Sequence, residues 1–250
     1  MKKIFLLLLS VFALAVLMYG PVSAAQVDLF HDDFDDNTLD PSKWTSDITG
    51  SGQVVENNQR LEFTILGAND PRHVYLSSSP FSAGNWISID FSGLWSIPTP
   101  HTAEFDLFIY DADDPSNYLR VNYQSWKGPN LRFWDSGSLL ESFGKTPPSA
   151  MTAFSLHLTD SAFEYREGGS LVRSYTSSTL ADANNFYIIM GGWDYSNHPN
   201  QNVYYDDITV SADVVPEPAS LLLLGLGLIG LAGQRKKKFS LRHRSPPGQG

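Results

Sequence analysis

Hydrophobic and polar residues alternate with a period of two along most of the chain after residue 26. The stretch from Leu61 to Ile65 puts three apolar side chains on one face of an extended strand and two polar ones on the other. Trp86 to Phe91, Ala153 to Leu158 and Ala162 to Glu167 repeat the pattern, and clusters of turn-forming residues separate such runs. The alternation predicts about 12 to 14 strands and no amphipathic helix, which indicates an all-β protein with two antiparallel sheets packed face to face.

Both ends of the chain break this pattern with long apolar runs. At the N-terminus, Lys2 and Lys3 precede an apolar stretch that reaches Tyr19, and the small residues from Val22 to Ala24 follow it. This order is typical of a cleaved secretory signal, so residues 1–25 are predicted to be a signal peptide. The alternative is an ordinary transmembrane helix.

The C-terminal apolar run, residues 219–233, is uncharged and rich in leucine, but it is shorter than the about 20 residues that usually cross a bilayer. A Pro-Glu-Pro motif precedes it and a basic cluster follows it: Pro216, Glu217 and Pro218, then Arg235, Lys236, Lys237 and Lys238. Because charged side chains cross a bilayer at high cost, the basic cluster is expected in the cytoplasm and everything before the motif outside it.

Residues 214–238 resemble the PEP-CTERM sorting signal of Gram-negative bacteria. The resemblance implies a short transmembrane helix that holds the chain at the inner membrane and processing by an exosortase-type protease. It also implies export to the periplasm, the outer surface or the extracellular matrix. The tail that follows, residues 239–250, is longer than this family usually has, and its composition predicts disorder.

Between the two ends, residues 26–213 have the length of one domain of ordinary size. They carry nine lysines and arginines against 26 acidic residues, a net charge of about −17. Such a charge repels nucleic acid and anionic lipid and favours a divalent cation. The chain has no cysteine, so the fold depends on its hydrophobic core and, we expect, on one bound Ca²⁺.

Two segments narrow the fold further. The first comprises His31, Asp32, Asp33, Phe34, Asp36, Asn37, Leu39, Asp40 and Trp44, and the second runs from Val203 to Val210. They resemble the first and last strands of concanavalin A-like jelly-roll modules of the laminarinase and LamG type, and Phe154 to Val172 resembles a hairpin of the same modules. The resemblance implies a jelly-roll sandwich whose first and last strands pair, and a function related to carbohydrate.

If these two strands are neighbours, Asp33 and Asp206 approach each other at the rim of the sandwich. Carboxylate oxygens are preferred ligands of Ca²⁺. Asp206 also alternates in line with the apolar Ile208 and Val210, where an unpaired carboxylate would be costly. We therefore predict one structural Ca²⁺ held by Asp33 and Asp206. The alternative is that both are solvated residues at strand ends.

The resemblance also raises the possibility of catalysis. Laminarinase-like enzymes carry the strand motif E-x-D-x-x-E, whose carboxylates serve as nucleophile, orienting acid and general acid/base. This chain has Glu104 and Asp106, but Ile109 stands at the third position. Because a retaining mechanism needs two working carboxyls about 5 to 5.5 Å apart, the missing proton donor predicts that the protein is not an enzyme.

The strand with Glu104 and the two that follow present one polar and aromatic face. Its candidate carbohydrate-binding residues are Glu104, Asp106, Tyr110, Tyr118, Arg120, Asn122, Gln124, Trp126, Arg132 and Trp134. Aromatic rings stack on the C–H faces of sugars, while amides and charged groups bind the hydroxyls. The alternative is a solvated face on which Arg120 and Arg132 pair with Glu104 and Asp106. Trp193 would either add a wall to this face or belong to the core.

The sequence therefore predicts an exported, exosortase-processed β-sandwich protein that binds, or is embedded in, extracellular polysaccharide through a non-catalytic module. Two alternatives stay open. A divergent laminarinase-like glycoside hydrolase or polysaccharide lyase would act on such a polymer, and a purely structural matrix or surface protein would only pack against its neighbours.

Overall fold

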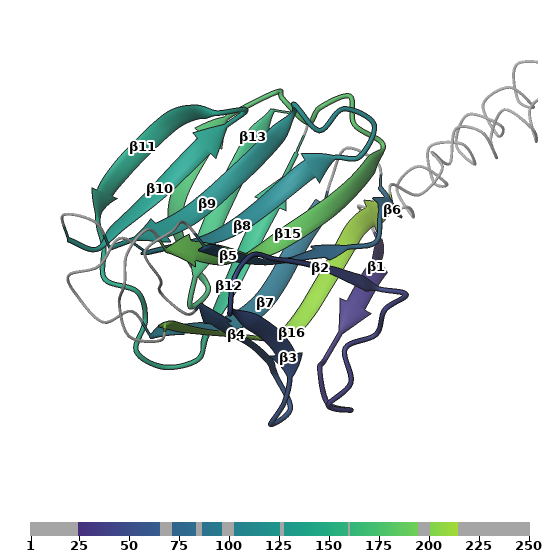
Figure 1. Ribbon diagram of the computed structural model, residues 1–250. Helices are drawn as coiled ribbons and strands as arrows, with labels where there is room; N and C mark the ends of the chain where they lie inside the picture. The colour runs from purple at the N-terminus through teal and green to yellow at the C-terminus, as the bar shows by residue number, and fades with distance from the viewer. Residues whose placement is uncertain are drawn as a thin grey trace, which may run out of the picture. The chain divides into compact units, whose positions relative to one another are not determined.

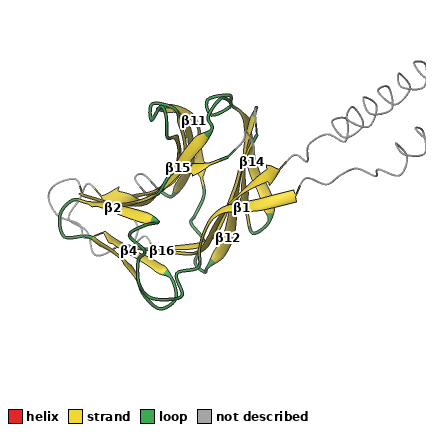
Figure 2. Cartoon of the chain, turned by 90° about the vertical axis from the view of Figure 1, so that its right-hand side faces the viewer, coloured by secondary structure: helices red, strands yellow, loops and turns green. Residues whose placement is uncertain are grey.

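The computed structural model describes residues 25–65, 72–83, 87–96, 103–125, 128–159, 161–194 and 201–214. The regular secondary structure of these residues is β-strand throughout, arranged in two antiparallel sheets that pack face to face (Figures 1 and 2). The prediction of an all-β, two-sheet sandwich is confirmed. Sixteen strands occur in the described residues, more than the alternation predicts, because short edge strands carry too few residues to show a period.

The first sheet, called the β7 sheet, is built from β1 (Ala25–Asp32), β3 (Gln53–Glu56), β4 (Leu61–Ile65), β7 (Ile87–Ser96), β12 (Thr152–Leu158), β13 (Ala162–Glu167), β14 (Ser170–Thr176) and β16 (Gln201–Val214). Its strand order is β14-β13-β12-β7-β16-β4-β3, and β1 pairs with β16. The first and last strands are therefore neighbours, as the sequence predicts.

The second sheet, called the β8 sheet, is built from β2 (Trp44–Ile48), β5 (Arg72–Ser78), β6 (Phe81–Ser82), β8 (Ala103–Asp111), β9 (Tyr118–Gln124), β10 (Asn130–Asp135), β11 (Ser138–Gly144) and β15 (Asn185–Asp194). Its strand order is β11-β10-β9-β8-β15-β5-β2, and β6 pairs with β15. Strands β5, β15 and β8 thus lie side by side although they are far apart in the sequence (Figure 1).

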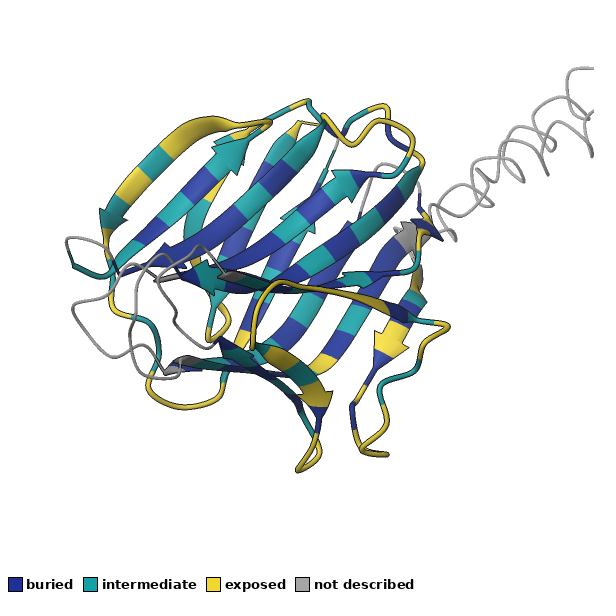
Figure 3. Ribbon diagram, viewed as in Figure 1, coloured by how far each residue is buried: buried dark blue, intermediate teal, exposed yellow. Residues whose placement is uncertain are grey.

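The core fills the space between the two sheets. Figure 3 shows the buried residues as alternating bands along the strands, which is the period of two that the sequence displays. Phe105 and Ile109 of β8 and Tyr205 of β16 are almost completely buried in this core. Such burial of apolar surface is the dominant favourable contribution to the stability of the fold.

A β-bulge interrupts β16 beside β7. The pairing shifts register between Asp206 and Thr209, and Asp207 adopts a positive φ of 51°. Tyr205 before the bulge and Ile208 after it are both buried in the core, so the bulge reverses which alternate residues face inward. Asp206 therefore does not share the core face with Ile208, and this expectation from the sequence was wrong.

The chain divides into two units, and the sandwich is the unit formed by Gln26–Asp213. The predicted signal peptide, the Pro-Glu-Pro motif, the basic cluster and the C-terminal tail lie outside the described residues. A search of the described ranges for a helix long and apolar enough to span a membrane finds none.

Candidate functional site

Three neighbouring strands, β8, β9 and β10, place the predicted residues on one face of the β8 sheet. Phe105 and Leu107 of β8 point into the core, so the residues that alternate with them point away from the other sheet. We call this surface the Glu104 face. Its residues are Glu104, Asp106, Phe108 and Tyr110 of β8, Tyr118, Arg120, Asn122 and Gln124 of β9, and Asn130, Arg132 and Trp134 of β10.

The carboxylate of Glu104 accepts hydrogen bonds from four side chains. Arg120 Nη2 lies 2.6 Å from Oε2, and the amide nitrogen of Asn122 lies 3.1 Å from the same oxygen. The indole nitrogen of Trp193 also donates to Oε2, at 3.1 Å, and Arg132 Nη1 lies 3.4 Å from Oε1. Glu104 is consequently buried, with a relative exposure of 6%.

Asp106 is the second carboxylate of the Glu104 face. Its Oδ1 accepts hydrogen bonds from Arg120 at 2.6 to 2.7 Å, and its Oδ2 accepts one from the hydroxyl of Tyr75 at 2.8 Å. Burial raises the pKa of Asp106 to about 6, although the positive charge of Arg120 acts to lower it. The ion pairs that the alternative interpretation requires are therefore present, but the carboxylates are buried rather than solvated.

Tyr75 reaches Asp106 across an intervening strand. Tyr75 of β5 pairs with Gly191 of β15, and Gly191 pairs in turn with Asp106 of β8. Gly191 has a φ of +139°. A Cβ at this residue would come within 2.9 Å of the Tyr75 ring and within 2.0 Å of the Val74 carbonyl oxygen. Glycine at this position lets the tyrosine lie over β15 and close the network.

Trp134 extends the network to β10. Its indole nitrogen donates to the side-chain oxygen of Asn122 at 2.9 Å, and the guanidinium of Arg120 lies 5.6 Å from the centre of its ring. Two buried polar atoms of the same face have no hydrogen-bond partner among the described residues: Gln124 Oε1 and Arg132 Nε. A buried polar atom of this kind requires a partner beyond the described residues, such as water, a ligand or another part of the chain.

The third acid of the enzyme motif has no counterpart on this face. The register between β8 and β9 runs without a bulge from Glu104 to Tyr110, so alternate residues of β8 keep to one side. Ile109 points into the core, with a relative exposure of 1%, and the residue that shares the face with Asp106 at the next position is Phe108. Neither residue can donate a proton.

The two predicted calcium ligands lie near the bulge of β16. Burial raises the pKa of Asp206, and the charges of Asp207, Asp35 and Asp33 raise it further, so Asp33 and Asp206 lie within electrostatic reach of each other. Within the described ranges, no group of three or more histidine, cysteine, aspartate or glutamate side chains is placed to hold a metal ion. Clustered carboxylates suit the chemistry of Ca²⁺, and the calcium site stays a prediction.

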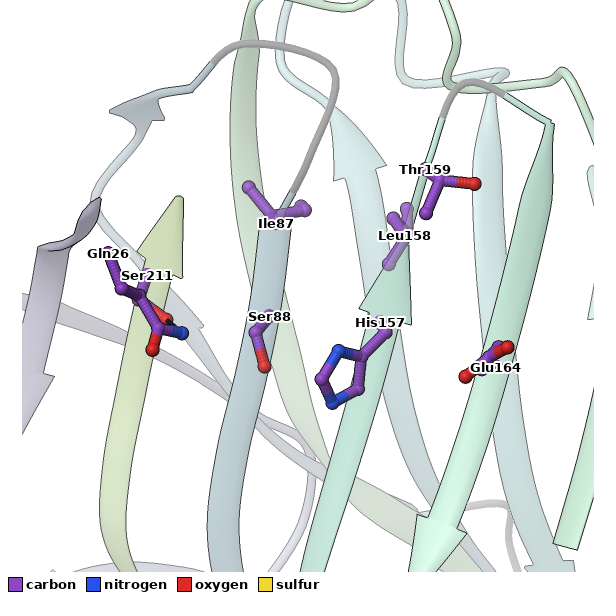
Figure 4. Close-up of a pocket in the computed structure, with 8 residues that line it drawn as sticks. All are labelled: Gln26, Ile87, Ser88, His157, Leu158, Thr159, Glu164 and Ser211. Atoms are coloured by element: carbon purple, nitrogen blue, oxygen red, sulfur yellow. Dashed lines mark hydrogen bonds between the residues drawn. The ribbon is translucent and has the colours of Figure 1, made fainter. Parts of the chain in front are cut away.

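A cavity of about 380 Å³ lies on the β7 sheet and not on the Glu104 face. Figure 4 shows its lining residues, which are Gln26, Ile87, Ser88, His157, Leu158, Thr159, Glu164 and Ser211. Two of its polar groups are used within the protein, because Gln26 donates to Ser211 at 2.5 Å and Ser88 donates to Asp90 at 2.7 Å. None of the predicted binding residues lines it.

Trp126, predicted as part of the site, lies outside the described residues. Conversely, the sequence analysis missed Tyr75 and Tyr187, which join the Glu104 face from β5 and β15. Trp193 belongs to this face and not to the core, since its nitrogen reaches Glu104. These residues could be located only from the positions of β5 and β15 beside β8 in the sheet, and local sequence patterns do not reveal which strands are neighbours.

Comparison with known proteins identifies the C-terminal segment first. The family described as "PEP-CTERM protein-sorting motif" matches residues 214–237. The chain carries a PEP-CTERM sorting motif. The matched segment contains the Pro-Glu-Pro residues and the basic cluster as far as Lys237, and the motif indicates export and sorting to the surface or beyond it. No curated protein matches the sequence.

Solved structures similar to the sandwich confirm the jelly-roll fold. The catalytic domain of an endo-1,3-beta-glucanase (laminarinase) from Thermotoga petrophila has a TM-score of 0.58 and 12% identity, over 76% of this chain and 99% of that one. An endo-beta-1,3-glucanase from Pyrococcus furiosus has a TM-score of 0.61 and 10% identity, over 76% and 96%. A Mycobacterium tuberculosis protein described as an immunostimulatory antigen and pseudo beta-1,3-glucanase has a TM-score of 0.56 and 12% identity, over 73% and 98%. At these identities the similarity shows the fold alone.

Proposed function

We propose that residues 26–213 form a non-catalytic carbohydrate-binding module that attaches the exported protein to extracellular polysaccharide. The jelly-roll fold is shared with proteins named as glucanases, and one of these is named a pseudo-glucanase. The observation that carries the proposal is the environment of Glu104, whose carboxylate is held by four donors of the protein itself.

A nucleophile must contact the anomeric carbon of a sugar, and a general acid must reach the leaving oxygen. Glu104 is covered by the arginines and tryptophan that bind it, and the side chain of Asp106 is completely buried. The third carboxylate is replaced by a core isoleucine. These three features favour a face that recognises a sugar over one that cleaves it.

The same face has the composition of a sugar-binding surface. Trp134 is half-buried and fixed by its hydrogen bond to Asn122, so its ring is presented at little cost in side-chain entropy. The buried polar atoms of Gln124 and Arg132 that lack a partner would be satisfied by hydroxyl groups, which both donate and accept. The structured network beneath would keep these groups in position.

The sorting motif supports the rest of the proposal. Before processing, the apolar run of residues 219–233 would hold the chain at the inner membrane of a Gram-negative bacterium, with the sandwich outside the cytoplasm. An exosortase-type protease would then act near Pro216, and the sandwich would reach the periplasm, the outer surface or the extracellular matrix.

Affinity electrophoresis of the purified protein in gels with soluble β-1,3-glucan tests the binding function. We expect the glucan to retard the wild type. Trp134→Ala should lower the affinity by about tenfold, because one aromatic contact with the sugar is lost. Tyr204→Ala is the matched control, because Tyr204 packs on Arg60 in the β7 sheet, away from the Glu104 face. Equal mobility of wild type and Trp134→Ala at every glucan concentration would refute the proposed site, and no retardation at all would favour the structural matrix protein.

A hydrolase remains the second candidate because of one observation. The pKa of Asp106 is raised to about 6, and carboxyls with perturbed pKa values are concentrated at catalytic sites. Incubation of the protein with β-1,3-glucan, followed by measurement of reducing ends, tests this activity. Reducing ends that are released by the wild type and lost in Glu104→Gln would overturn the non-catalytic assignment.

A further inference from the structure

Four aromatic side chains gather at the end of the Glu104 face that lies beyond Asp106 along β8. We call them the tyrosine platform: Phe108 and Tyr110 of β8, Tyr118 of β9 and Tyr187 of β15. Tyr187, Tyr110 and Tyr118 pair in one row across three neighbouring strands. Six residues of extended strand separate Glu104 from Tyr110, a distance of about 20 Å along β8.

The rings form one continuous surface. Tyr110 stacks on Tyr187 with centroids 5.1 Å apart and an angle of 6° between the rings. The ring centre of Tyr118 lies 5.0 Å from that of Tyr110, and the ring centre of Phe108 lies 5.5 Å from it. Phe108 also contacts Arg120, whose guanidinium lies 5.0 Å from the centre of the phenylalanine ring. All four side chains are half-buried, so part of each ring faces solvent.

The hydroxyl groups of this platform are unused. Within the described part of the chain, no hydrogen bond to the protein engages the hydroxyls of Tyr110, Tyr118 or Tyr187. Burial and the two neighbouring tyrosines raise the pKa of Tyr110 to about 12, so its hydroxyl stays neutral and keeps its proton. The platform therefore combines flat apolar rings with free donors and acceptors at their tips.

The charges of the protein limit what could bind there. Every lysine and arginine whose side chain is described takes part in an ion pair: Lys43, Arg60, Arg120, Arg132, Lys145, Arg166 and Arg173. The domain as a whole carries a net charge of about −17. An anionic sugar polymer or a nucleic acid would meet repulsion from this charge, and among the described side chains every cation is already paired.

From these observations we infer that the tyrosine platform is a second contact site for uncharged sugars, distinct from the carboxylate network and reached by the same polysaccharide chain. This inference rests on the proposed function. Because the ring of Tyr110 is packed between its neighbours, neutral pyranose rings would place their C–H faces against the solvent-facing parts of Tyr118 and Tyr187, while the phenol hydroxyls bind sugar hydroxyls. A polymer that spans the distance from Trp134 to the platform would gain from both contacts at once, because the second contact forms at a high effective concentration.

The test compares three variants of the purified protein: the double variant Tyr118→Ala/Tyr187→Ala, its ring-retaining partner Tyr118→Phe/Tyr187→Phe, and Trp134→Ala. Affinities are measured by titration calorimetry with a β-1,3-glucan disaccharide and with the soluble polymer. We expect the alanine pair to lower affinity for the polymer by about tenfold and the phenylalanine pair by less, with disaccharide binding unchanged. Melting curves show whether each variant is folded. If the alanine pair does not fold, the phenylalanine pair still tests the contribution of the hydroxyl groups.

The outcomes separate the two proposals. If the alanine pair binds the polymer like the wild type while Trp134→Ala loses binding, the platform inference is overturned and the proposed function stands. If the alanine pair loses binding while Trp134→Ala does not, the platform is the main site. If the wild type binds no glucan, both proposals are wrong. If it binds acidic polysaccharide in preference to glucan, the platform inference is overturned and the proposed function stands.

Discussion

At the scale of single residues, the carboxylates of the Glu104 face are buried, and hydrogen bonds and ion pairs with neighbouring side chains compensate the loss of their hydration. Arg120 is the central cation, because it contacts both Glu104 and Asp106. Removal of one member of such a buried group leaves the others uncompensated, which is costly. The network therefore also holds Trp134 and Arg132 in place on the face that we propose binds sugar.

The buried carboxyl of Asp106 predicts a specific dependence of stability on pH. Its pKa is about 6 in the folded chain, against 3.8 for an unperturbed aspartate, so between these values the folded state binds more protons than the unfolded state. The contribution of this group to the free energy of unfolding therefore falls as pH rises from about 4 to about 6. Relative to Asp106→Asn, we expect the wild type to lose about 2 to 3 kcal/mol between pH 4 and pH 7.

Urea denaturation of the wild type and Asp106→Asn at several pH values measures this difference. Asp182→Asn is the control, since Asp182 is exposed and lies outside the Glu104 face, so its replacement should leave the pH profile unchanged. Parallel profiles of the wild type and Asp106→Asn would show that Asp106 does not titrate with a raised pKa.

At the scale of strands, β15 matters because it brings β5 next to β8. Gly191 has a φ of +139°, and a Cβ there would lie 2.0 Å from the Val74 carbonyl oxygen. We expect Gly191→Ala to lower the free energy of unfolding by about 3 kcal/mol or more, because backbone atoms of β5 must move. Gly144→Ala in β11 is the control, since nothing lies within 4 Å of a Cβ there. Thermal melting compares the two, and equal melting temperatures would contradict the close approach.

The period of two predicted the faces of β8, β9 and β10 because only one side of each strand can be buried in the core. Residues such as Glu104, Arg120 and Trp134 were therefore assigned to one face of the sheet correctly from the sequence. The prediction failed at Asp206, because a bulge changes the alternation and depends on the pairing of β16 with β7. Tyr75 and Tyr187 were missed for the same reason, as strand pairing over long sequence distances is not a local property.

The junction of β1 and β16 leads to a test of the calcium prediction. An ion that binds only the folded chain raises its free energy of unfolding, by about 2.7 kcal/mol at a concentration 100 times its Kd. We expect a melting temperature roughly 5 to 10 °C higher in Ca²⁺ than in chelator, from the size of the domain. Asp33→Asn should remove this difference, whereas Asp28→Asn, an exposed change in β1, should keep it. The same melting temperature in Ca²⁺ and in chelator would argue against the site.

At the scale of the whole molecule, the sandwich and the sorting motif occupy separate parts of the chain. Gln26–Asp213 contains the core and the Glu104 face, while the sorting motif occupies residues 214–237. We therefore expect sugar binding by the sandwich to be independent of the C-terminal segment. A change in the motif should alter the location of the protein and leave its affinity for glucan unchanged.

Glu217→Ala tests this separation, because it alters the Pro-Glu-Pro motif without touching the sandwich. In a host that has an exosortase-type protease, we expect the wild type to be shortened and released from the membrane fraction. Glu217→Ala should instead accumulate at full length in that fraction, held by the apolar run and the basic cluster. Pro246→Ala/Pro247→Ala is the control, since both prolines lie after the matched segment. Immunoblots of fractionated cells distinguish the two forms by size, and normal shortening of Glu217→Ala would mean that the protease recognises another feature of the segment.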